Sequence, residues 1–239
     1  MMTFKFNQQQ IQEAISADIP SYMNNLRDRD PILRKDCFIR GKLAEIWFRD
    51  FFQCYGFQVE TNLKDGGTDI DLSIKALFLN SQKISFDAPI KIEIKTSLIP
   101  NKNFDIYKSG DLKIYAKNDN PSYDIDWNMG IQVYYHQLKR EWEQNIPNFN
   151  SDLASEYEKL NFSCSWIEKN RALSYIQQLS PNDRKWSFLK SRQEFWHCPL
   201  GIHSHNIYES VVYLMSILLN KCLCEVNLLQ NEIQRLQNY

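Results

Sequence analysis

The stretch PIKIEIKTSL, residues 89–98, places Lys91, Glu93 and Lys95 between three isoleucines. An apolar run of this length predicts a β-strand, and successive side chains of a strand point to opposite faces. The isoleucines are therefore expected on one face and the three charged residues on the other. Two interpretations follow. Either the charged face meets water, or Glu93 and Lys95 project side by side into a cleft and carry out chemistry there.

The flanking sequence predicts strands and helices in a fixed order. Apolar residues at helical spacing predict a helix over residues 30–55, which Gly56 ends. We expect residues 57–63 to form a short strand, residues 64–79 a Gly-Gly turn followed by an alternating strand, and residues 129–138 a strand that leads into a helix. This order predicts an α/β fold, a mixed β-sheet flanked by helices.

From Asn206 to its end the chain has neither proline nor glycine, and apolar residues recur every three or four positions. This pattern predicts one long amphipathic helix as a C-terminal extension. Its apolar stripe is either part of the core or a seam for a partner, and the heptad-like steps favour a homodimer through this helix. We expect a single domain over residues 1–239, with a core at about 30–145 and a recognition and dimerisation region at about 150–239.

Composition excludes some classes of protein. The 43% hydrophobic content is enough for a folded core, and 28 basic against 29 acidic residues mean that any basic surface must be local. No signal peptide and no apolar run long enough to span a bilayer are recognisable, so no membrane partner is predicted. Six cysteines without a CxxC pair suit a reducing compartment, which predicts a cytoplasmic protein.

A second acidic residue, Asp69, stands at the start of the strand that precedes Glu93. If the two strands pair, both carboxylates converge on one point, and they repel each other unless a cation lies between them. Hard oxygen ligands favour Mg²⁺. Lys95 beside such an ion could orient or deprotonate a water whose pKa the metal lowers. Hydrolysis of a phosphodiester requires this combination.

These residues resemble the PD-(D/E)XK nuclease superfamily, which has the restriction-endonuclease-like fold, and look like its Mrr-like and resolvase-like branches. The family pattern is an Asp at a strand start, followed on the next strand by an acidic residue, any residue and Lys. Here Asp69 and Glu93-Ile94-Lys95 match it, and Glu45 matches a glutamate that many members carry on the preceding helix. The resemblance covers roughly residues 38–97. Thr68 replaces the usual proline, and about two dozen residues separate Asp69 from Glu93, so the hairpin must be long.

The resemblance implies a role for each matching residue. Asp69 and Glu93 would bind Mg²⁺, for which Mn²⁺ could substitute, with the backbone carbonyl of Ile94 as a third protein ligand. Lys95 would position the attacking water. Glu45 would hold a second metal or a metal-bound water, and Asp71 ranks after Asp69 as a ligand.

The implied function is a Mg²⁺-dependent endodeoxyribonuclease, which we expect to be a type II restriction-type enzyme acting on double-stranded DNA. Two alternatives remain open. One is a DNA-repair or Holliday-junction-resolving nuclease of the same fold. The other is a non-catalytic nucleic-acid- or protein-binding module, in which the acidic residues are surface charges.

Two basic stretches could contact DNA, although an ordinary amphipathic surface has the same composition. Their candidate residues are Lys102, Lys108, Lys113 and Lys117 in the first, and Arg184, Lys185, Lys190 and Arg192 in the second. His197, His203 and His205 cluster beside Cys198, and zinc binding with Cys222 and Cys224 is conceivable. Because the spacing matches no zinc pattern, we expect a loop with polar packing residues instead.

Overall fold

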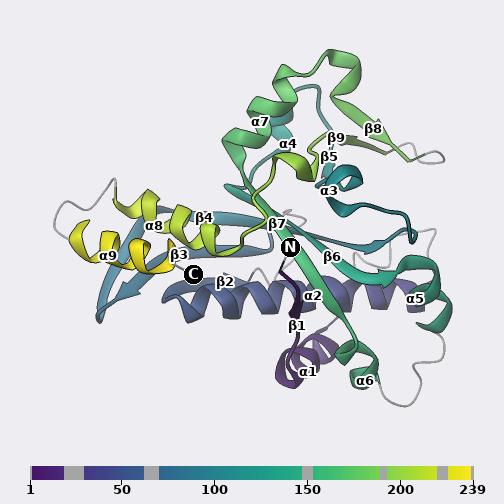
Figure 1. Cartoon of the computed structure of the whole chain (residues 1–239), viewed down its shortest axis with the longest axis horizontal. Helices are drawn as coiled ribbons and strands as arrows, with labels where there is room; N and C mark the ends of the chain where they lie inside the picture. The colour runs from purple at the N-terminus through teal and green to yellow at the C-terminus, as the bar shows by residue number, and fades with distance from the viewer. Residues whose placement is uncertain are drawn as a thin grey trace.

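The computed structural model describes residues 2–18, 30–61, 70–146, 153–188, 193–219 and 226–237. For residues 226–229, 236 and 237 only the backbone is described. A six-stranded sheet has the order β1-β7-β6-β4-β3-β2, and a three-stranded sheet has the order β5-β9-β8 (Figure 1). The strands of the main sheet are β1 (Phe4–Lys5), β2 (Phe57–Thr61), β3 (Leu72–Leu79), β4 (Gln82–Ile99), β6 (Met129–Leu138) and β7 (Asn161–Glu168). The small sheet contains β5 (Ile114–Tyr115), β8 (Lys185–Ser187) and β9 (Glu194–Trp196).

Helices flank the main sheet, so the predicted α/β fold with a mixed sheet is confirmed. Only β4 and β6 run parallel among the paired strands that are described. The helices are α1 (Gln8–Ser16), α2 (Pro31–Cys54), α3 (Ile106–Ser109), α4 (Pro121–Asp124), α5 (Lys139–Asn145), α6 (Leu153–Glu158), α7 (Lys169–Gln178), α8 (Tyr208–Leu219) and α9 (Val226–Gln237). Among them, none is both long and apolar enough to cross a bilayer.

The long helix α2 begins and ends where its sequence specifies. The Asp30 side chain caps the first turn by accepting a hydrogen bond of 2.7 Å from the Ile32 N–H, and Pro31 occupies the first helical position. At the other end Gly56 has φ +83°, a conformation that favours glycine. A Cβ atom at Gly56 would lie 2.5 Å from the carbonyl oxygen of Phe78. The predicted end of the helix at Gly56 is confirmed.

Strands β3 and β4 form the long hairpin that the sequence pattern required. Asn80 and Ser81 connect them, both with positive φ (49° and 66°), as in tight two-residue hairpin turns. The register shifts between Ile74 and Ala76. On the side of this shift away from the turn, Leu72 pairs with Ile92. β4 thus begins at Gln82, seven residues before the predicted strand, because residues 82–85 pair with the end of β3.

The two faces of the main sheet are covered by different layers. Ile92 and Ile94 belong to the main core, which also contains Ile39, Leu43 and Ala44 of α2. The opposite face lies against a second core cluster, which joins Leu112 and Trp127 to Ile114 of β5 and Trp196 of β9. A Cβ atom at Gly130 of β6 would lie 2.7 Å from Leu112 and 3.0 Å from Trp127. Figure 1 shows α2 along one side of the sheet, and β5, β8 and β9 with α7 on the other. Charged side chains on β4 can therefore become enclosed.

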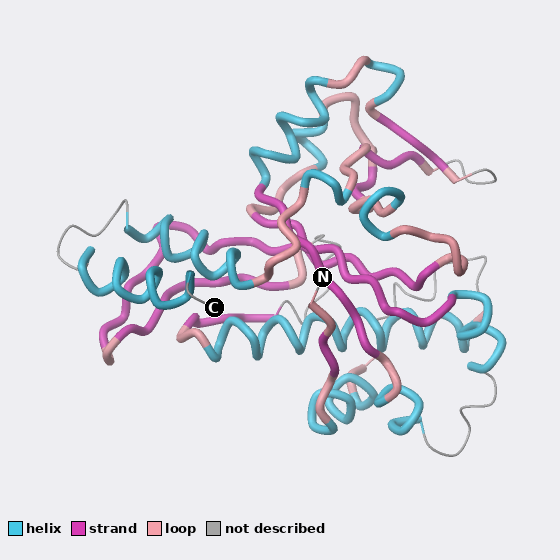
Figure 2. The backbone as a smooth tube through the Cα atoms, in the orientation of Figure 1, coloured by secondary structure: helices cyan, strands magenta, loops and turns pink. Residues whose placement is uncertain are grey.

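The C-terminal region contains two helices, so the prediction of one long helix is wrong. Helix α8 ends at Leu219, and α9 lies alongside it (Figure 2). The apolar side of α8 packs inside the molecule through buried residues: Val211, Leu214, Met215 and Leu218. Along α8, the apolar stripe predicted from the sequence therefore packs into the core. Because α9 folds back against α8, more apolar surface is covered than in one extended helix.

Candidate active site at the edge of β4

The β3–β4 pairing ends within the described residues at Leu72 opposite Ile92, and β4 continues to Ile99. Asp71 lies where the two strands part. Its backbone N–H donates to the Ile92 carbonyl (3.0 Å), and its carboxylate oxygen Oδ2 accepts from the Ile94 N–H (2.5 Å). The Asp71 carboxylate is therefore held on the edge of β4, within one residue of both Glu93 and Lys95.

The backbone of Ile94 faces the same edge. Successive residues of a strand direct their N–H and C=O groups to opposite neighbouring strands, so alternate residues face the same neighbour. The Lys91 carbonyl accepts from Asn128 next to β6, whereas the Ile92 carbonyl accepts from Asp71 on the β3 side. Ile94 follows the orientation of Ile92, as its N–H bond to Asp71 shows. Its carbonyl therefore points to the side on which the Asp71 carboxylate lies.

Glu93 and Lys95 lie side by side, as the alternation predicted. The Glu93 residue is only 4% exposed, and its Oε1 forms an ion pair with the ammonium of Lys95. A buried carboxylate requires a counter-charge or hydrogen bonds, since removing it from water is costly. The interpretation of a face that meets water fails for Glu93. It holds for Lys91, whose 43% exposed side chain pairs with the exposed Asp126 at 2.7 Å.

A cavity of about 510 Å³ follows this edge of β4. Its walls include residues 94–98, the N-terminal half of α2, and parts of β5 and α5. Four basic side chains line it, namely Arg40, Lys95, Lys113 and Lys139, and the acidic residue among its lining side chains is Glu143. Because phosphate contacts supply most of the affinity for nucleic acid, a cavity of this charge suits a phosphate backbone.

Arg40 is fixed in this wall by a buried network. Its guanidinium forms an ion pair of 2.8 Å with Asp36, whose other oxygen accepts hydrogen bonds from Trp142 (2.9 Å) and Tyr157 (3.1 Å). Burial disfavours the charge of Arg40, but the negative charge of Asp36 outweighs burial and raises the pKa of Arg40 above its ordinary value. The Tyr135 hydroxyl also donates to the Arg40 carbonyl at 2.5 Å. Arg40 is thus a permanent, rigidly held cation.

Gln132 is a further polar group beside this site. It is the partner of Lys95 in the parallel β4–β6 register, and it is fully buried. Its amide nitrogen donates to Ser97 Oγ (3.3 Å) and to the Val133 carbonyl (3.0 Å). The sequence analysis missed Gln132, Arg40 and Lys139, because only the folded chain brings them to β4.

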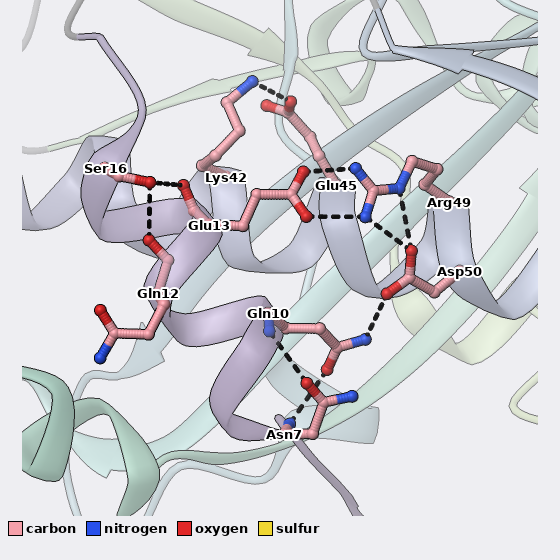
Figure 3. A network of polar contacts seen from close by, with 9 residues as sticks. All are labelled: Asn7, Gln10, Gln12, Glu13, Ser16, Lys42, Glu45, Arg49 and Asp50. Carbon is pink, nitrogen blue, oxygen red and sulfur yellow. Dashed lines mark hydrogen bonds and ion pairs between the residues drawn. The ribbon is translucent and has the colours of Figure 1, made fainter.

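Two further candidate ligands are Glu45 and Asp69. Glu45 lies on α2 and forms an ion pair with Lys42, close to the Glu13–Arg49 pair (Figure 3). Its role toward a second metal stays a prediction. Asp69 lies outside the described residues, so its convergence with Glu93 stays a prediction too.

The donor set suits a hard divalent ion. Among the described residues, no group of three or more His, Cys, Asp or Glu side chains is arranged to hold a metal ion. At the edge of β4 the available donors are the carboxylates of Asp71 and Glu93 and the carbonyl of Ile94. All are oxygen donors of the kind that Mg²⁺ prefers. These residues fit Mg²⁺ by their chemistry.

The histidines take part in separate polar contacts. His203 contacts Ser165 Oγ (3.1 Å) and Cys198 Sγ (3.5 Å), and burial lowers the pKa of His203 to about 3. His197 pairs with Asp111, and the His205 ring packs against Tyr107. The expectation that these histidines are polar packing residues is therefore confirmed. Cys222 and Cys224 lie outside the described residues.

The predicted DNA-contacting lysines and arginines have different surroundings. Lys102 and Lys108 are exposed, and Lys117 lies over the Tyr115 ring. Arg184 donates to the carbonyls of Leu179 and Gln177, and Lys185 lies 4.8 Å from the centre of the Trp196 ring, so both contribute to packing of the small sheet. Lys190 and Arg192 lie outside the described residues.

In comparisons with protein-family models, with curated proteins and with solved structures, nothing matches this chain. The comparisons therefore assign no family.

Proposed function

We propose that this protein is a Mg²⁺-dependent endodeoxyribonuclease with a restriction-endonuclease-like fold, and that its active site lies at the edge of β4. One observation supports the proposal most. The buried Glu93 carboxylate, paired with the half-buried Lys95, lies next to the Asp71 carboxylate, at a strand edge that opens into a cavity lined by basic side chains. A buried carboxylate paired with a lysine beside a second carboxylate is unusual in a purely structural sheet.

Each group has a chemical role in this proposal. Asp71, Glu93 and the Ile94 carbonyl would hold the metal, and when bound the ion lowers the pKa of water and offsets charge on the phosphate. Lys95 orients the attacking water and stabilises the negative charge that develops on the phosphate. Arg40, Lys113 and Lys139 bind the phosphates on either side of the scissile bond. Asp69 and Glu45 stay predicted contributors to the same site.

The finer assignments are also proposals. The substrate is double-stranded DNA, and the reaction is of the type II restriction kind, carried out by a homodimer through the C-terminal region. This preference depends on chain length and on analogy between folds. A repair or junction-resolving nuclease would use the same groups. The non-catalytic module is the weaker alternative, because Glu93 is buried and is not a surface charge.

Incubation of the purified full chain with supercoiled plasmid, linear duplex and a four-way junction tests the proposal. We expect nicked and linear plasmid in the presence of Mg²⁺ and intact plasmid in the presence of EDTA. Faster cutting of the junction than of the duplex would favour the resolving nuclease. DNA binding without any Mg²⁺-dependent cutting would favour the non-catalytic module.

A further inference from the structure

A second cavity, of about 390 Å³, adjoins the one along β4. The two cavities have Ser97, Leu98, Lys113 and Lys139 in common, so they share part of a wall. Lys113 stands at the junction. Its ammonium donates to Ser97 Oγ at 3.0 Å and lies 5.7 Å from the centre of the Phe188 ring. A volume near 390 Å³ is at the small end of the roughly 300–1,000 Å³ found for ligand sites, which suits one nucleotide unit.

Aromatic side chains form much of the wall of this second cavity. Phe104 and Tyr134 contribute one ring pair, with centroids 5.7 Å apart. Trp186 and Phe188, from the small sheet and the residue after it, contribute another, with centroids 5.0 Å apart. Phe188 is 50% exposed, which leaves its ring available to a ligand. Flat aromatic surfaces of this kind stack with nucleobases, and each stacked base contributes about 1–3 kcal/mol.

The cavity also has a fixed acceptor. The Asp111 carboxylate accepts from the Cys198 N–H (3.1 Å) and pairs with His197 Nδ1 (2.8 Å), and its side chain is 13% exposed. Burial raises the pKa of Asp111 to about 6, against the effect of these two partners. A carboxylate held in this way accepts a hydrogen bond from an exocyclic amino group.

A donor lies beside that acceptor. The buried Trp186 indole N–H is near enough to Asp111 to lower the pKa of that carboxyl. Within the part of the chain that is described, it makes no hydrogen bond of ordinary geometry. An indole N–H is a donor only. A ligand that offers an amino group next to a ring nitrogen acceptor would satisfy both Asp111 and Trp186.

We propose that this second cavity receives one nucleobase, unstacked from a nucleic acid strand that lies along β4. Adenine and cytosine each present an amino donor beside a ring acceptor on the Watson–Crick edge, and thymine does not. The cavity therefore prefers adenine or cytosine to thymine. Lys113, between the two cavities, binds the phosphate next to the unstacked base. The inference rests on the proposed function, because it places the strand in the basic cavity at β4.

Binding of labelled single-stranded dA12, dC12 and dT12 in EDTA, followed by fluorescence anisotropy, tests this inference without any cleavage. We expect the full chain to bind dA12 and dC12 several-fold more tightly than dT12. Phe188→Ala should weaken binding of all three about tenfold, the loss of one stacking contact. Asp111→Asn should remove the preference over dT12, because its carboxamide retains the bond from Cys198 but no longer accepts with two oxygens. Tyr123→Ala, which removes a 75% exposed ring outside the cavity, is the matched control and should bind as the unmodified protein does.

The outcomes separate this inference from the nuclease proposal. Equal binding by Phe188→Ala, Asp111→Asn and the unmodified protein, or no binding of any oligonucleotide, would overturn the base site. If the protein selects bases but never cuts plasmid in Mg²⁺, the base site stands and the nuclease proposal falls. If it cuts plasmid while both variants bind the oligonucleotides as the unmodified protein does, the nuclease proposal stands and the base site falls. Because Phe188 is half exposed, its variant is expected to fold even if Asp111→Asn does not.

Discussion

Glu93 is a carboxylate enclosed by the sheet, and the cation that neutralises it is the ammonium of Lys95. The same lysine would act on water during hydrolysis. Under the proposed mechanism Lys95 therefore has a structural and a chemical role, and a single substitution removes both. Separating them requires a second change at Glu93.

Lys95→Ala should abolish cleavage and also lower the free energy of unfolding by about 3 kcal/mol, since it leaves a buried charge without its partner. The double variant Lys95→Ala with Glu93→Gln should regain much of that stability, because the buried charge is gone, yet it should still not cut DNA. Urea denaturation and plasmid cleavage measure the two effects. Cleavage by Lys95→Ala would place the reacting group elsewhere.

Asp111 should make stability depend on pH. Burial raises the pKa of Asp111 from 3.8 to about 6, so the folded state binds this proton more tightly than the unfolded state does. The contribution is fully present below pH 3.8 and is lost as the pH rises through 6, with a total of about 3 kcal/mol. Compared with Asp111→Asn, the unmodified protein should thus lose stability between pH 4 and pH 7 in urea titrations. Parallel curves for the two proteins would contradict this.

At the level of single residues, alternation in one strand was enough to predict that Glu93 and Lys95 share a side. Alternation could not predict which acidic residue, Asp69 or Asp71, lies beside them. Asp71 was placed after Asp69, but whether Asp71 reaches β4 depends on the point at which the hairpin opens, and its bond to the Ile94 N–H reveals that point. Arg40 and Lys139 have no local pattern that marks them, because helices remote in sequence bring them to β4.

At the level of elements, Gly41 within α2 and Gly56 just after its end form a matched pair of glycines. A Cβ atom at Gly41 meets nothing within 4 Å, so Gly41→Ala should stabilise the protein by about 0.5–1 kcal/mol. Gly56→Ala should destabilise it by more than about 1 kcal/mol, since φ is +83° and the new atom would lie 2.5 Å from the Phe78 carbonyl oxygen. Thermal unfolding of both variants measures the difference. A stable Gly56→Ala protein would show that the helix does not need this turn.

The elements differ in how well sequence specifies them. The bounds of α2 follow from Asp30, Pro31 and Gly56, which act locally. The first half of β4 was not predicted, because it becomes a strand only through its pairing with β3. The division of the C-terminal region into α8 and α9 was not predicted either, because the apolar spacing continues from one helix into the next.

For the whole molecule, the near balance of charge hides a local concentration of basic groups. The chain carries 28 basic and 29 acidic residues, yet four basic side chains line the cavity at β4. They come from α2, from β4, from the segment before β5 and from α5, so only the fold brings them together. The small sheet closes the other side of Glu93 and adds the aromatic cavity. In the proposed arrangement, metal, phosphate and base would occupy three neighbouring positions.

The most direct test is the rate of plasmid cleavage over a Mg²⁺ titration, for the unmodified protein, Asp71→Asn and Asp126→Asn. Asn at position 71 can still accept from the Ile94 N–H, so the fold should remain while the charge is lost. We expect Asp71→Asn to cut at least about 100-fold more slowly. Asp126→Asn should stay within about twofold, because an exposed ion pair contributes little. Cleavage by Asp71→Asn at the unmodified rate, or cleavage that needs no divalent ion, would contradict the account.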